Sequence, residues 1–343
     1  MKKYEVNLYQ STDDDEILLP VVIPPPIQSY LPISIIANIA TANMKNLTWI
    51  MHNFVQLFKY ADAEKVESFP VQQFMYVSQS VISCKEITKE VMSKERIDVI
   101  EDIIYCINHQ HYVVIYLNEN LIPDMRHYQH KAIVHSQFIF GYNREKQIFK
   151  VINFSKKSDQ MEVIDVTFSD VRSNFYSADL SELYEKCTSE YIRKKGFQIY
   201  ALQYCDHIDN IDSTLNPEVI KEQIRQYLYS VNSSMYTSYF TGTLHGTWGM
   251  DVYEEIGTML LKKLDIRFAC LLYEHKVFMQ YRISYLDETL AEEYSTVVKM
   301  ANILKMYCLK CMIKKKIEKP EMIIKYLTDM KSAEKNILEK LFL

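Results

Sequence analysis

The chain has 343 residues, of which 48% are apolar and 24% charged, with a net charge of −5. A chain of this length and composition can bury two cores of ordinary size, which excludes a disordered or fibrous protein. Its acidic balance and its 6 glycines exclude a broad cationic surface and a phosphate-cradling loop, so we expect neither nucleic acid nor a nucleotide as ligand.

The first half of the chain reads as helices followed by strands. Prolines among residues 18–27 predict an extended segment. Apolar residues three and four positions apart then predict helices from residue 29 to about residue 58, with more helical sequence at 86–108. Short β-branched and aromatic runs predict an antiparallel meander, with strands at 112–117, 136–143, 147–154 and 161–168. Helices before a sheet indicate an α+β domain at residues 1–205.

The second half reads as helices throughout. Asn216 and Pro217 suit the cap and the first position of a helix, and apolar residues then recur on one face. Similar periodicity continues along the rest of the sequence, and helices are expected at 252–264, 266–286, 291–313 and 320–342. These segments predict a helical domain at residues 213–343.

The sequence has no pattern of export or membrane insertion. Two lysines at its start are followed by acidic residues, unlike a secretory signal, and no run of about 18 apolar residues is present. Its 7 cysteines, scattered without a framework, are typical of free thiols in a reducing compartment. We therefore expect a cytoplasmic protein without disulfides.

One stretch of the expected sheet carries residues suited to catalysis. His135 stands where a strand begins, and Asn153 stands near the end of the next strand. In papain-like enzymes a histidine at a strand start is the base, and an Asn or Asp on the following strand orients its ring. Such enzymes place the nucleophile at the N-terminus of an early helix, where the helix dipole and free amides stabilise negative charge. Here that position reads Ser29-Tyr30.

These residues, with others in the same order, resemble the butirosin biosynthesis protein H type of acyltransferases, which are encoded beside nonribosomal peptide and polyketide assembly lines. The resemblance spans most of the chain and rests on the order and spacing of its motifs rather than on any one of them. The corresponding positions here are Ser29-Tyr30, Asn118, Ile122-Pro123, His135, Gly141-Tyr142-Asn143, Asn153-Phe154, Gly249, Asp251, Tyr253, Glu274-His275-Lys276, Arg282 and Tyr285-Leu286. Asparagine stands at 118, 143 and 153, where the family has aspartate.

The resemblance implies a papain-like fold and an amide-forming acyl transfer. Residue 29 would take an acyl group from the phosphopantetheine thioester of an acyl or peptidyl carrier protein and pass it to a small-molecule amine. His135 would be the general base and then the acid, Asn153 would orient its ring, and backbone amides near residue 29 would hold the oxyanion. No dissociable cofactor is implied beyond the pantetheine arm of the carrier.

Serine at residue 29 departs from the family, which has cysteine there. A hydroxyl is a much weaker acid than a thiol and depends on full assistance from a base. Three interpretations stay open: a native serine nucleophile, a site without catalysis in a carrier-binding protein, or a Cys→Ser substitution. A hydrolase that uses water in place of the amine keeps the same site and is a further alternative.

Four residues are expected to bind substrate. Tyr30 and Tyr142 belong to the matching motifs, and His245 and Trp248 lie in a segment that holds four of the 6 glycines. Clustered glycines in a chain that otherwise avoids them indicate a loop with close contacts, and loops carry specificity. We expect residues 242–250 to line the acceptor side of the active site.

Three other motifs are better explained by structure than by chemistry. Five histidines from His109 to His135 lack the Glu or Cys spacing of a zinc site, so no metal is expected. Cys308 and Cys311 share a helix face with apolar residues, which favours core packing over a redox or zinc role. The lysines at 314–316 are typical of a solvated helix face and are also a candidate dock for an acidic carrier protein.

Overall fold

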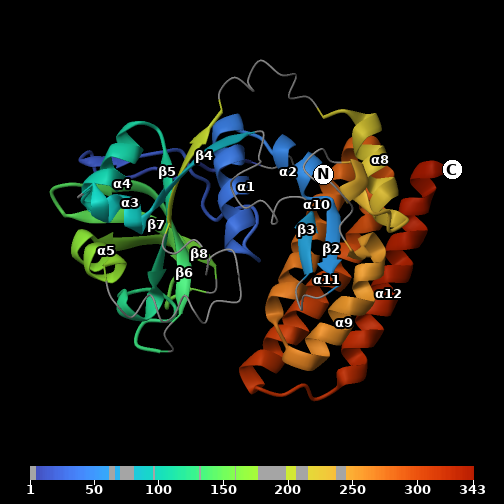
Figure 1. Ribbon diagram of the computed structural model, residues 1–343. Coiled ribbons are helices and arrows are strands. Elements are labelled where there is room, and N and C mark those ends of the chain that lie inside the picture. Colours follow the sequence, from blue (N-terminus) through green and yellow to red (C-terminus); the bar gives the residue numbers. More distant parts are fainter. Residues whose placement is uncertain are drawn as a thin grey trace. The chain divides into compact units, whose positions relative to one another are not determined.

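The protein folds into two compact units (Figure 1). The computed structural model describes residues 5–61, 66–69, 81–95, 97–130, 133–158, 160–176, 198–205, 215–236 and 245–343. Of these, the sheet unit takes residues within Glu5–Asn46 and Tyr76–Ile211, and the helical unit takes residues within Leu47–Met75 and Asp212–Leu343. The helical unit is therefore built from two separate stretches of the chain.

The sheet unit is built on an antiparallel sheet whose described strands lie in the order β4-β9-β5-β6-β7-β8, with β1 paired to β6. Strands β5 and β6, and then β6 to β8, pair with their neighbours along the chain. The end of β5, the start of β6, the end of β7 and the start of β8 therefore meet at one end of the sheet. The strands are β1 (Glu16–Leu18), β4 (Ile82–Thr88), β5 (Tyr112–Asn118), β6 (Val134–Asn143), β7 (Ile148–Phe154), β8 (Met161–Thr167) and β9 (Gln198–Tyr204).

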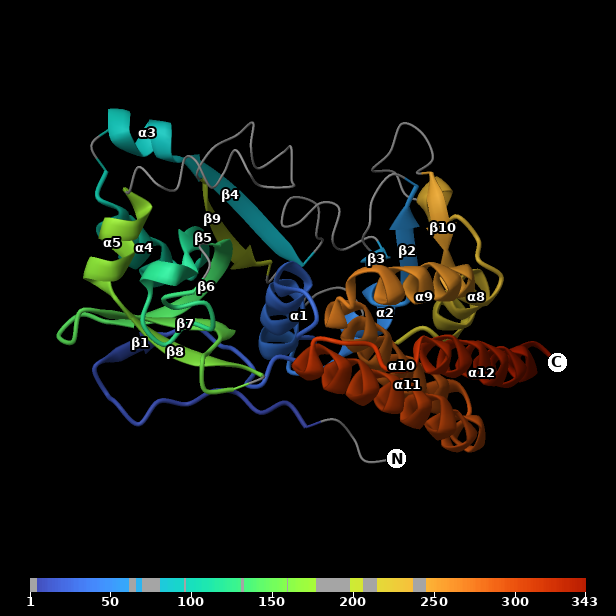
Figure 2. The ribbon, with the colours of Figure 1, turned by 90° about the horizontal axis from the view of Figure 1, so that it is seen from below.

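Helices cover both faces of this sheet, with α1 on one side and α4 and α5 on the other (Figures 1 and 2). α1 has no charged residue and is buried almost all round, as expected of a helix packed inside a domain. Pro32 stands in its first turn, and Lys45 ends it in the left-handed conformation. The helices are α1 (Leu31–Met44), α3 (Lys89–Lys94), α4 (Val99–Asn108), α5 (Phe168–Phe175) and the short 3-10 helix η1 (Glu119–Leu121).

The helical unit is dominated by three long helices, α10, α11 and α12. Asp287 ends α10 and caps α11, because its side chain accepts a hydrogen bond from the N–H of Leu290 at 2.9 Å. Along the described parts of the chain, none of the helices combines the length and the apolar character of a membrane span. The elements of the unit are α2 (Thr48–Asn53), β2 (Gln56–Tyr60), β3 (Val66–Phe69), α8 (Pro217–Leu228), η3 (Ser233–Tyr236), β10 (Gly246–Trp248), η4 (Gly249–Asp251), α9 (Val252–Lys263), α10 (Ile266–Leu286), α11 (Glu288–Lys314), α12 (Pro320–Glu339) and η5 (Lys340–Phe342).

Two buried side chains of α10 tie the early stretch of this unit to the late one. Arg282 donates three hydrogen bonds of 2.7 Å to backbone carbonyls at the end of α2, where a cation also complements the helix dipole. His275 Nε2 donates to the carbonyl of Val55 at 2.6 Å, 220 residues earlier in the chain. In the small sheet, β2 lies between β3 and β10. These contacts explain why α2 and β2 belong with the C-terminal helices.

A buried ion pair joins α10 to α12. Lys276 Nζ lies 2.8 Å from Glu334 Oε2, and both side chains are fully buried. The same carboxylate accepts hydrogen bonds from the hydroxyls of Tyr227, Tyr253 and Tyr294. Burial lowers the pKa of Lys276 to about 8, although Glu334 acts to raise it. Five helices thus meet at one carboxylate.

The α+β class is confirmed, and the four strands of the meander and the four late helices lie where the sequence predicts them. Two segments differ. Residues 56–60, expected at the end of a helix, form strand β2, and residues 82–88, expected in part as helix, form strand β4. β4 pairs with β9, and β2 pairs with β10 as well as with the nearby β3. Because β9 and β10 lie far along the chain, the local periodicity of residues 56–60 and 82–88 did not reveal these strands.

The boundary between the two units also differs from the expected one. The sequence predicts domains at 1–205 and 213–343, which assigns residues 47–75 to the first domain. In the structure the described residues of this segment pack with the C-terminal helices. The bonds from Arg282 and His275 explain the difference, because buried backbone carbonyls at residues 50–55 find their donors in α10.

Breaking the buried ion pair should destabilise the helical unit. In Lys276→Met the carboxylate of Glu334 stays buried without its charged partner, so we expect the free energy of unfolding to fall by about 3–5 kcal/mol. Trp49 and Trp248, the 2 tryptophans of the chain, both lie in this unit. Urea unfolding followed by tryptophan fluorescence therefore reports on it directly.

The matched control for this variant removes both charges. Lys276→Met combined with Glu334→Leu leaves no unpaired ion in the core and should recover a large part of the lost stability. A Lys276→Met protein as stable as the unaltered one would show that the ion pair contributes nothing.

Candidate functional site

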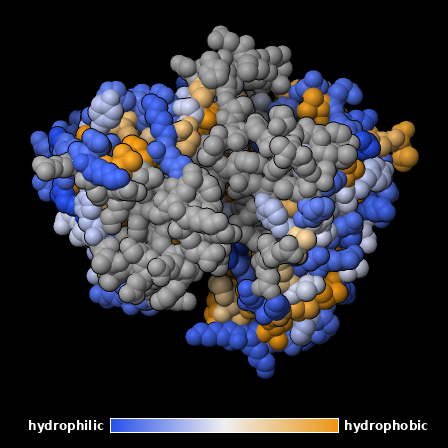
Figure 3. Space-filling view, in the orientation of Figure 1, coloured by the Kyte–Doolittle hydropathy of each residue, from blue (hydrophilic) through white to orange (hydrophobic). Residues whose placement is uncertain are grey.

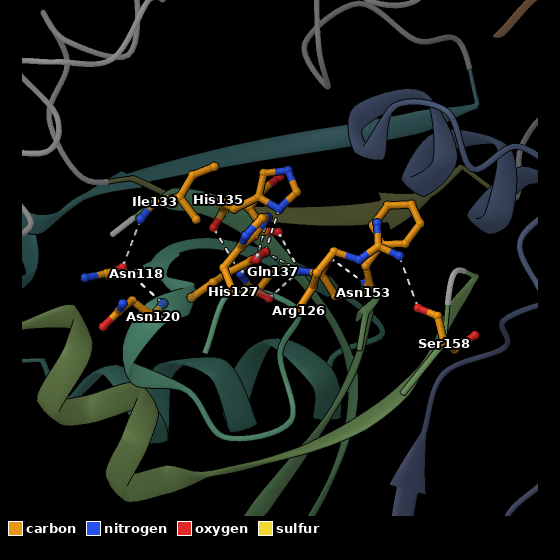
Figure 4. A network of polar contacts seen from close by, with 12 residues as sticks. Asn118, Asn120, Arg126, His127, Ile133, His135, Gln137, Asn153 and Ser158 are labelled. Carbon is orange, nitrogen blue, oxygen red and sulfur yellow. Dashed lines mark hydrogen bonds and ion pairs between the residues drawn. The ribbon is translucent and has the colours of Figure 1, made fainter. Parts of the chain in front are cut away.

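His135, at the start of β6, is held by a buried carboxylate. Its Nδ1 atom lies 2.6 Å from Oε1 of Glu119, which follows the end of the neighbouring strand β5 (Figure 4). The side chain of Glu119 is 2% exposed and that of His135 is 38% exposed. An ionised carboxylate accepts hydrogen bonds and cannot donate one, so Nδ1 carries a proton, and in the neutral form of the ring Nε2 keeps its lone pair. This is the arrangement of a general base oriented by an acid.

The chain turns tightly after β5 to place Glu119 beside β6. The side chain of Asn118 accepts hydrogen bonds of 3.2 Å from the N–H groups of Asn120 and Ile133. Asn174 of α5 donates to the carbonyl of Asn118 and accepts from its N–H, each at 2.9 Å. The N–H of Glu119 itself donates to the carbonyl of Ile133 at 3.1 Å. These bonds fix the backbone on both sides of Glu119.

Asn153 contacts Glu119 rather than His135. Its Nδ2 donates to Glu119 Oε1 at 3.1 Å and to Gln137 Oε1 at 2.7 Å. Gln137 Nε2 lies 3.5 Å from the same oxygen of Glu119. The sequence predicts that Asn153 orients the ring of His135, whereas in the structure Glu119 makes that contact and Asn153 orients Glu119. The longer acidic side chain from the β5 turn fills the position expected for the amide.

The charge of Glu119 is fixed by its neighbours. Burial acts to raise its pKa, but the hydrogen bond from His135 and the charges of His135 and His127 outweigh burial, so the pKa of Glu119 lies below its ordinary value. His127 Nε2 is 4.0 Å from Glu119 Oε2. Glu119 is therefore a carboxylate at neutral pH, a group that stabilises positive charge on an imidazole bonded to it.

The register of the sheet decides on which face these side chains lie. Side chains alternate along a strand, and residues directly opposite in neighbouring strands share a face. Phe138 comes three residues after His135 and lies opposite Ile152, the residue before Asn153. His135 and Asn153 therefore share one face of the sheet, and Phe138 lies on the other.

α1 packs on the face opposite to His135. The Ser34 hydroxyl lies 3.3 Å from the sulfur of Met161, and Met161 pairs with Phe154, which follows Asn153. Gln28 Oε1 accepts a hydrogen bond of 2.9 Å from the N–H of Met161. The residues just before α1 therefore lie beside the start of β8, at the same end of the sheet as the start of β6.

The structure brings Ser29 and His135 to one end of the sheet but not into a hydrogen bond. Ser29 is buried and precedes Tyr30, the N-cap residue of α1, which is also buried. Among the described residues, the hydrogen bond of the His135 ring is to Glu119 and none is to Ser29.

Tyr142 lies away from this site. It follows His135 by seven residues on the same strand, a separation of about 20 Å at the rise of a β-strand. Its hydroxyl donates to Asn108 Oδ1 at 2.8 Å, and its side chain is buried. Tyr142 therefore lies too far from His135 to contact a group that reacts there, and its contact with a substrate stays a prediction. The Gly-Tyr-Asn motif ends β6, and its Asn143 stabilises the following turn by accepting a hydrogen bond from the N–H of Lys146.

His245 and Trp248 belong to the helical unit. Trp248 is buried and packs on Phe58, with ring centroids 4.3 Å apart. His245 is exposed just before β10. A Cβ on Gly246 would lie 2.0 Å from the carbonyl oxygen of Lys59, so β-sheet pairing accounts for that glycine. In the segment expected to line the acceptor, residues 242–244 lie outside the described residues.

Glu119 is the residue of the site that sequence reasoning missed. The signal present in the sequence is an acidic residue directly after a buried strand, one strand away from the candidate base. Acidic residues are common in such loops, so this signal alone does not identify Glu119. It indicates a partner of His135 only once the pairing of β5 with β6, which sets Leu117 opposite His135, is known. The pairing brings the turn after β5 beside the imidazole.

The candidate metal and thiol motifs carry no site in the described residues. No group of three or more His, Cys, Asp or Glu side chains in this part of the chain is arranged to hold a metal. The described cysteines are free thiols. Cys308 and Cys311 are buried in α11, and burial, together with Cys311 and Cys270, raises the pKa of Cys308 to about 12. Such a thiol stays protonated and serves packing.

Comparison with known proteins assigns no family. No protein-family model matches the chain, and no curated protein matches it.

Removing the charge of Glu119 should lower stability at neutral pH and have little effect in acid. Because the folded-state pKa of Glu119 is depressed, its stabilising effect is present above the unfolded value of about 4.3 and is lost as the pH falls through the folded value. We expect Glu119→Gln to lower the free energy of unfolding by about 1–3 kcal/mol near pH 7. Urea unfolding followed by circular dichroism, at neutral and acidic pH, measures the difference.

Glu162→Gln provides the matched control for this experiment. Glu162 lies opposite Asn153 on β8 and is not among the residues that bond to Glu119 or His135, so its substitution should change stability little at either pH. Equal stability of Glu119→Gln and the unaltered protein at neutral pH would contradict a structural role for the ion pair.

Proposed function

We propose that the protein is an amide-forming acyltransferase of papain-like fold that moves an acyl group from a carrier-protein phosphopantetheine thioester to an amine. The observation that carries this proposal is the pair of His135 and Glu119, in which a buried carboxylate holds Nδ1 while part of the ring stays exposed. The order of α1 followed by an antiparallel sheet with histidine at a strand start supports the papain-like fold. The resemblance to the butirosin biosynthesis protein H type supports the thioester donor.

In the proposed reaction His135 moves a proton between acceptor and leaving group. Nε2 accepts the proton of the amine as its nitrogen attacks the thioester carbonyl. The C–N bond forms, the C–S bond breaks, and His135 returns the proton to the pantetheine thiolate. Glu119 stabilises the imidazolium between these steps, and Asn153 holds Glu119 in place. The thioester is the activated donor, so the reaction consumes no ATP.

Residue 29 defines a second route for the same reaction, in which the acyl group first joins its side chain and the amine then removes it. The burial of Ser29 favours the direct route in this structure, because the covalent route requires the thioester to reach that side chain. A cysteine at residue 29 favours the covalent route, because a thiolate forms with less help from a base. The two routes differ in whether an acyl-enzyme accumulates.

A hydrolase that acts on the same thioesters is the second candidate. The exposure of His135 favours it, because water also reaches a side chain that is 38% exposed. Water in place of the amine yields a carboxylic acid. The ratio of amide to acid in the products separates the two functions.

Product formation should depend on the His135–Glu119 pair. With acyl-pantetheine thioesters and a set of amines, we expect His135→Ala to lower the rate of amide formation by about 10²–10⁴-fold, the usual contribution of a positioned base. Glu119→Gln should lower it less, because the ring is retained. His109→Ala, which removes an exposed histidine after α4, is the matched control and should keep the full rate. Mass spectrometry of the products measures each rate.

Intact-protein mass spectrometry of the unaltered chain and of Ser29→Cys identifies the route. An acyl adduct that an added amine discharges would assign the covalent route, and amide formed without an adduct would assign the direct one. If no thioester gives amide or acid with either protein, catalysis is refuted and a carrier-binding protein without turnover takes its place.

A further inference from the structure

One face of α11 carries a row of exposed side chains that mixes lysines with large apolar residues. We call it the α11 stripe, and its members are Lys299, Ile303, Met306, Lys310, Ile313 and Lys314. Its first five members are spaced four, three, four and three residues apart, which places them along one side of the helix. The apolar members are 48%, 52% and 73% exposed in chain order. Single exposed apolar residues are ordinary, but three in one row mark an interaction surface.

The stripe is cationic, although the chain as a whole is acidic. Between Ser295 and Ile317 the sequence holds six lysines, at 299, 305, 310, 314, 315 and 316, and no acidic residue. Lys305 lies over the ring of Tyr273 of α10 at 3.9 Å and is not part of the stripe. Lys314 forms an ion pair with Glu318 at 2.8 Å, at the end of the helix. Figure 3 shows hydrophobic beside hydrophilic residues at the lower end of the helical unit, where α11 leads into α12.

We propose that the α11 stripe docks an acidic α-helix of a protein partner. Ile303, Met306 and Ile313 follow the three-and-four spacing by which one helix receives the apolar side chains of another. Lys299 and Lys310 lie within the row, where carboxylates of the partner helix form ion pairs with them. Apolar contact supplies affinity, and charge complementarity supplies orientation and speed of association.

The position of Lys310 favours a partner helix over a membrane surface. A helix that binds a bilayer buries an uninterrupted apolar face and keeps its lysines at the margin. Lys310 lies between Met306 and Ile313 within the apolar row, so bilayer insertion would draw an unpaired ammonium group toward the acyl chains. A carboxylate on a partner helix pairs with the same group. A second copy of this chain is a poor occupant, because two cationic stripes repel each other.

The proposed function requires a carrier protein as acyl donor, and we identify the partner of the α11 stripe with that carrier. This identification rests on the proposed function. Docking through α11 would hold the carrier while its pantetheine arm delivers the acyl group. A thioester on free pantetheine lacks the carrier surface and bypasses the stripe. Carrier-borne and free substrates therefore separate docking from chemistry.

The test compares Lys299→Glu/Lys310→Glu with Lys325→Glu/Lys335→Glu, a matched control that reverses two exposed lysines of α12. We expect the α11 variant to bind a fluorescently labelled holo-carrier protein at least about tenfold more weakly and the control less than about twofold more weakly. The binding of the unaltered protein should also weaken as salt rises. Ile313→Ser tests the apolar part of the stripe and should weaken binding in both low and high salt. With free acyl-pantetheine, all these variants should react like the unaltered protein.

Binding is measured without turnover, so docking and catalysis fail separately. Carrier binding that depends on the stripe, in a protein that transfers no acyl group, would support the docking surface and refute the proposed function. Equal binding by the α11 variant and its control, or no carrier binding at all, would overturn the docking surface. Binding to vesicles of phosphatidylserine and phosphatidylcholine that the α11 substitutions abolish, without carrier binding, would overturn it in favour of a membrane surface.

Discussion

In both units a buried carboxylate holds several helices or strands together, because it needs hydrogen-bond donors from each of them. A carboxylate removed from water must recover its hydration from protein donors, and one element alone rarely supplies enough of them. In the sheet unit Glu119 takes its donors from β6 and β7, and in the helical unit Glu334 takes them from four helices other than its own. Each carboxylate therefore fixes how several elements meet. The difference is exposure, because the ring beside Glu119 reaches solvent and the groups around Glu334 do not.

That difference explains why only one of the two clusters is a candidate for chemistry. Lys276 and Glu334 are fully buried, and they form hydrogen bonds with each other and with tyrosine hydroxyls. His135 uses one ring nitrogen for Glu119 and keeps the other for a reacting group. A general base needs both a fixed orientation and an open position. Of these two clusters, the one at the start of β6 has both.

Much of the fold is readable from the sequence because local patterns set it. Alternating and continuous β-branched runs gave the central strands, and Asn216, Pro217 and Pro320 marked helix starts that the structure has. The partner of His135 was not readable, because Glu119 reaches it only through the pairing of β5 with β6. The placement of α2 and β2 was not readable either, since it depends on side-chain to backbone bonds from α10. Local patterns predict the helices and strands, and long-range hydrogen bonds decide which of them pack together.

The division of the helical unit into two stretches has a consequence for folding during synthesis. α2 and β2 leave the ribosome early, but the side chains of Arg282 and His275 that satisfy their carbonyls follow more than 200 residues later. The carboxylate of Glu334 comes later still. The carbonyls of residues 50–55 therefore stay hydrated, or bound to a chaperone, until α10 has been synthesised. The part of the sheet unit that lies between residues 55 and 275 in the sequence is made in that interval. The order of synthesis places the sheet unit first and completes the helical unit last.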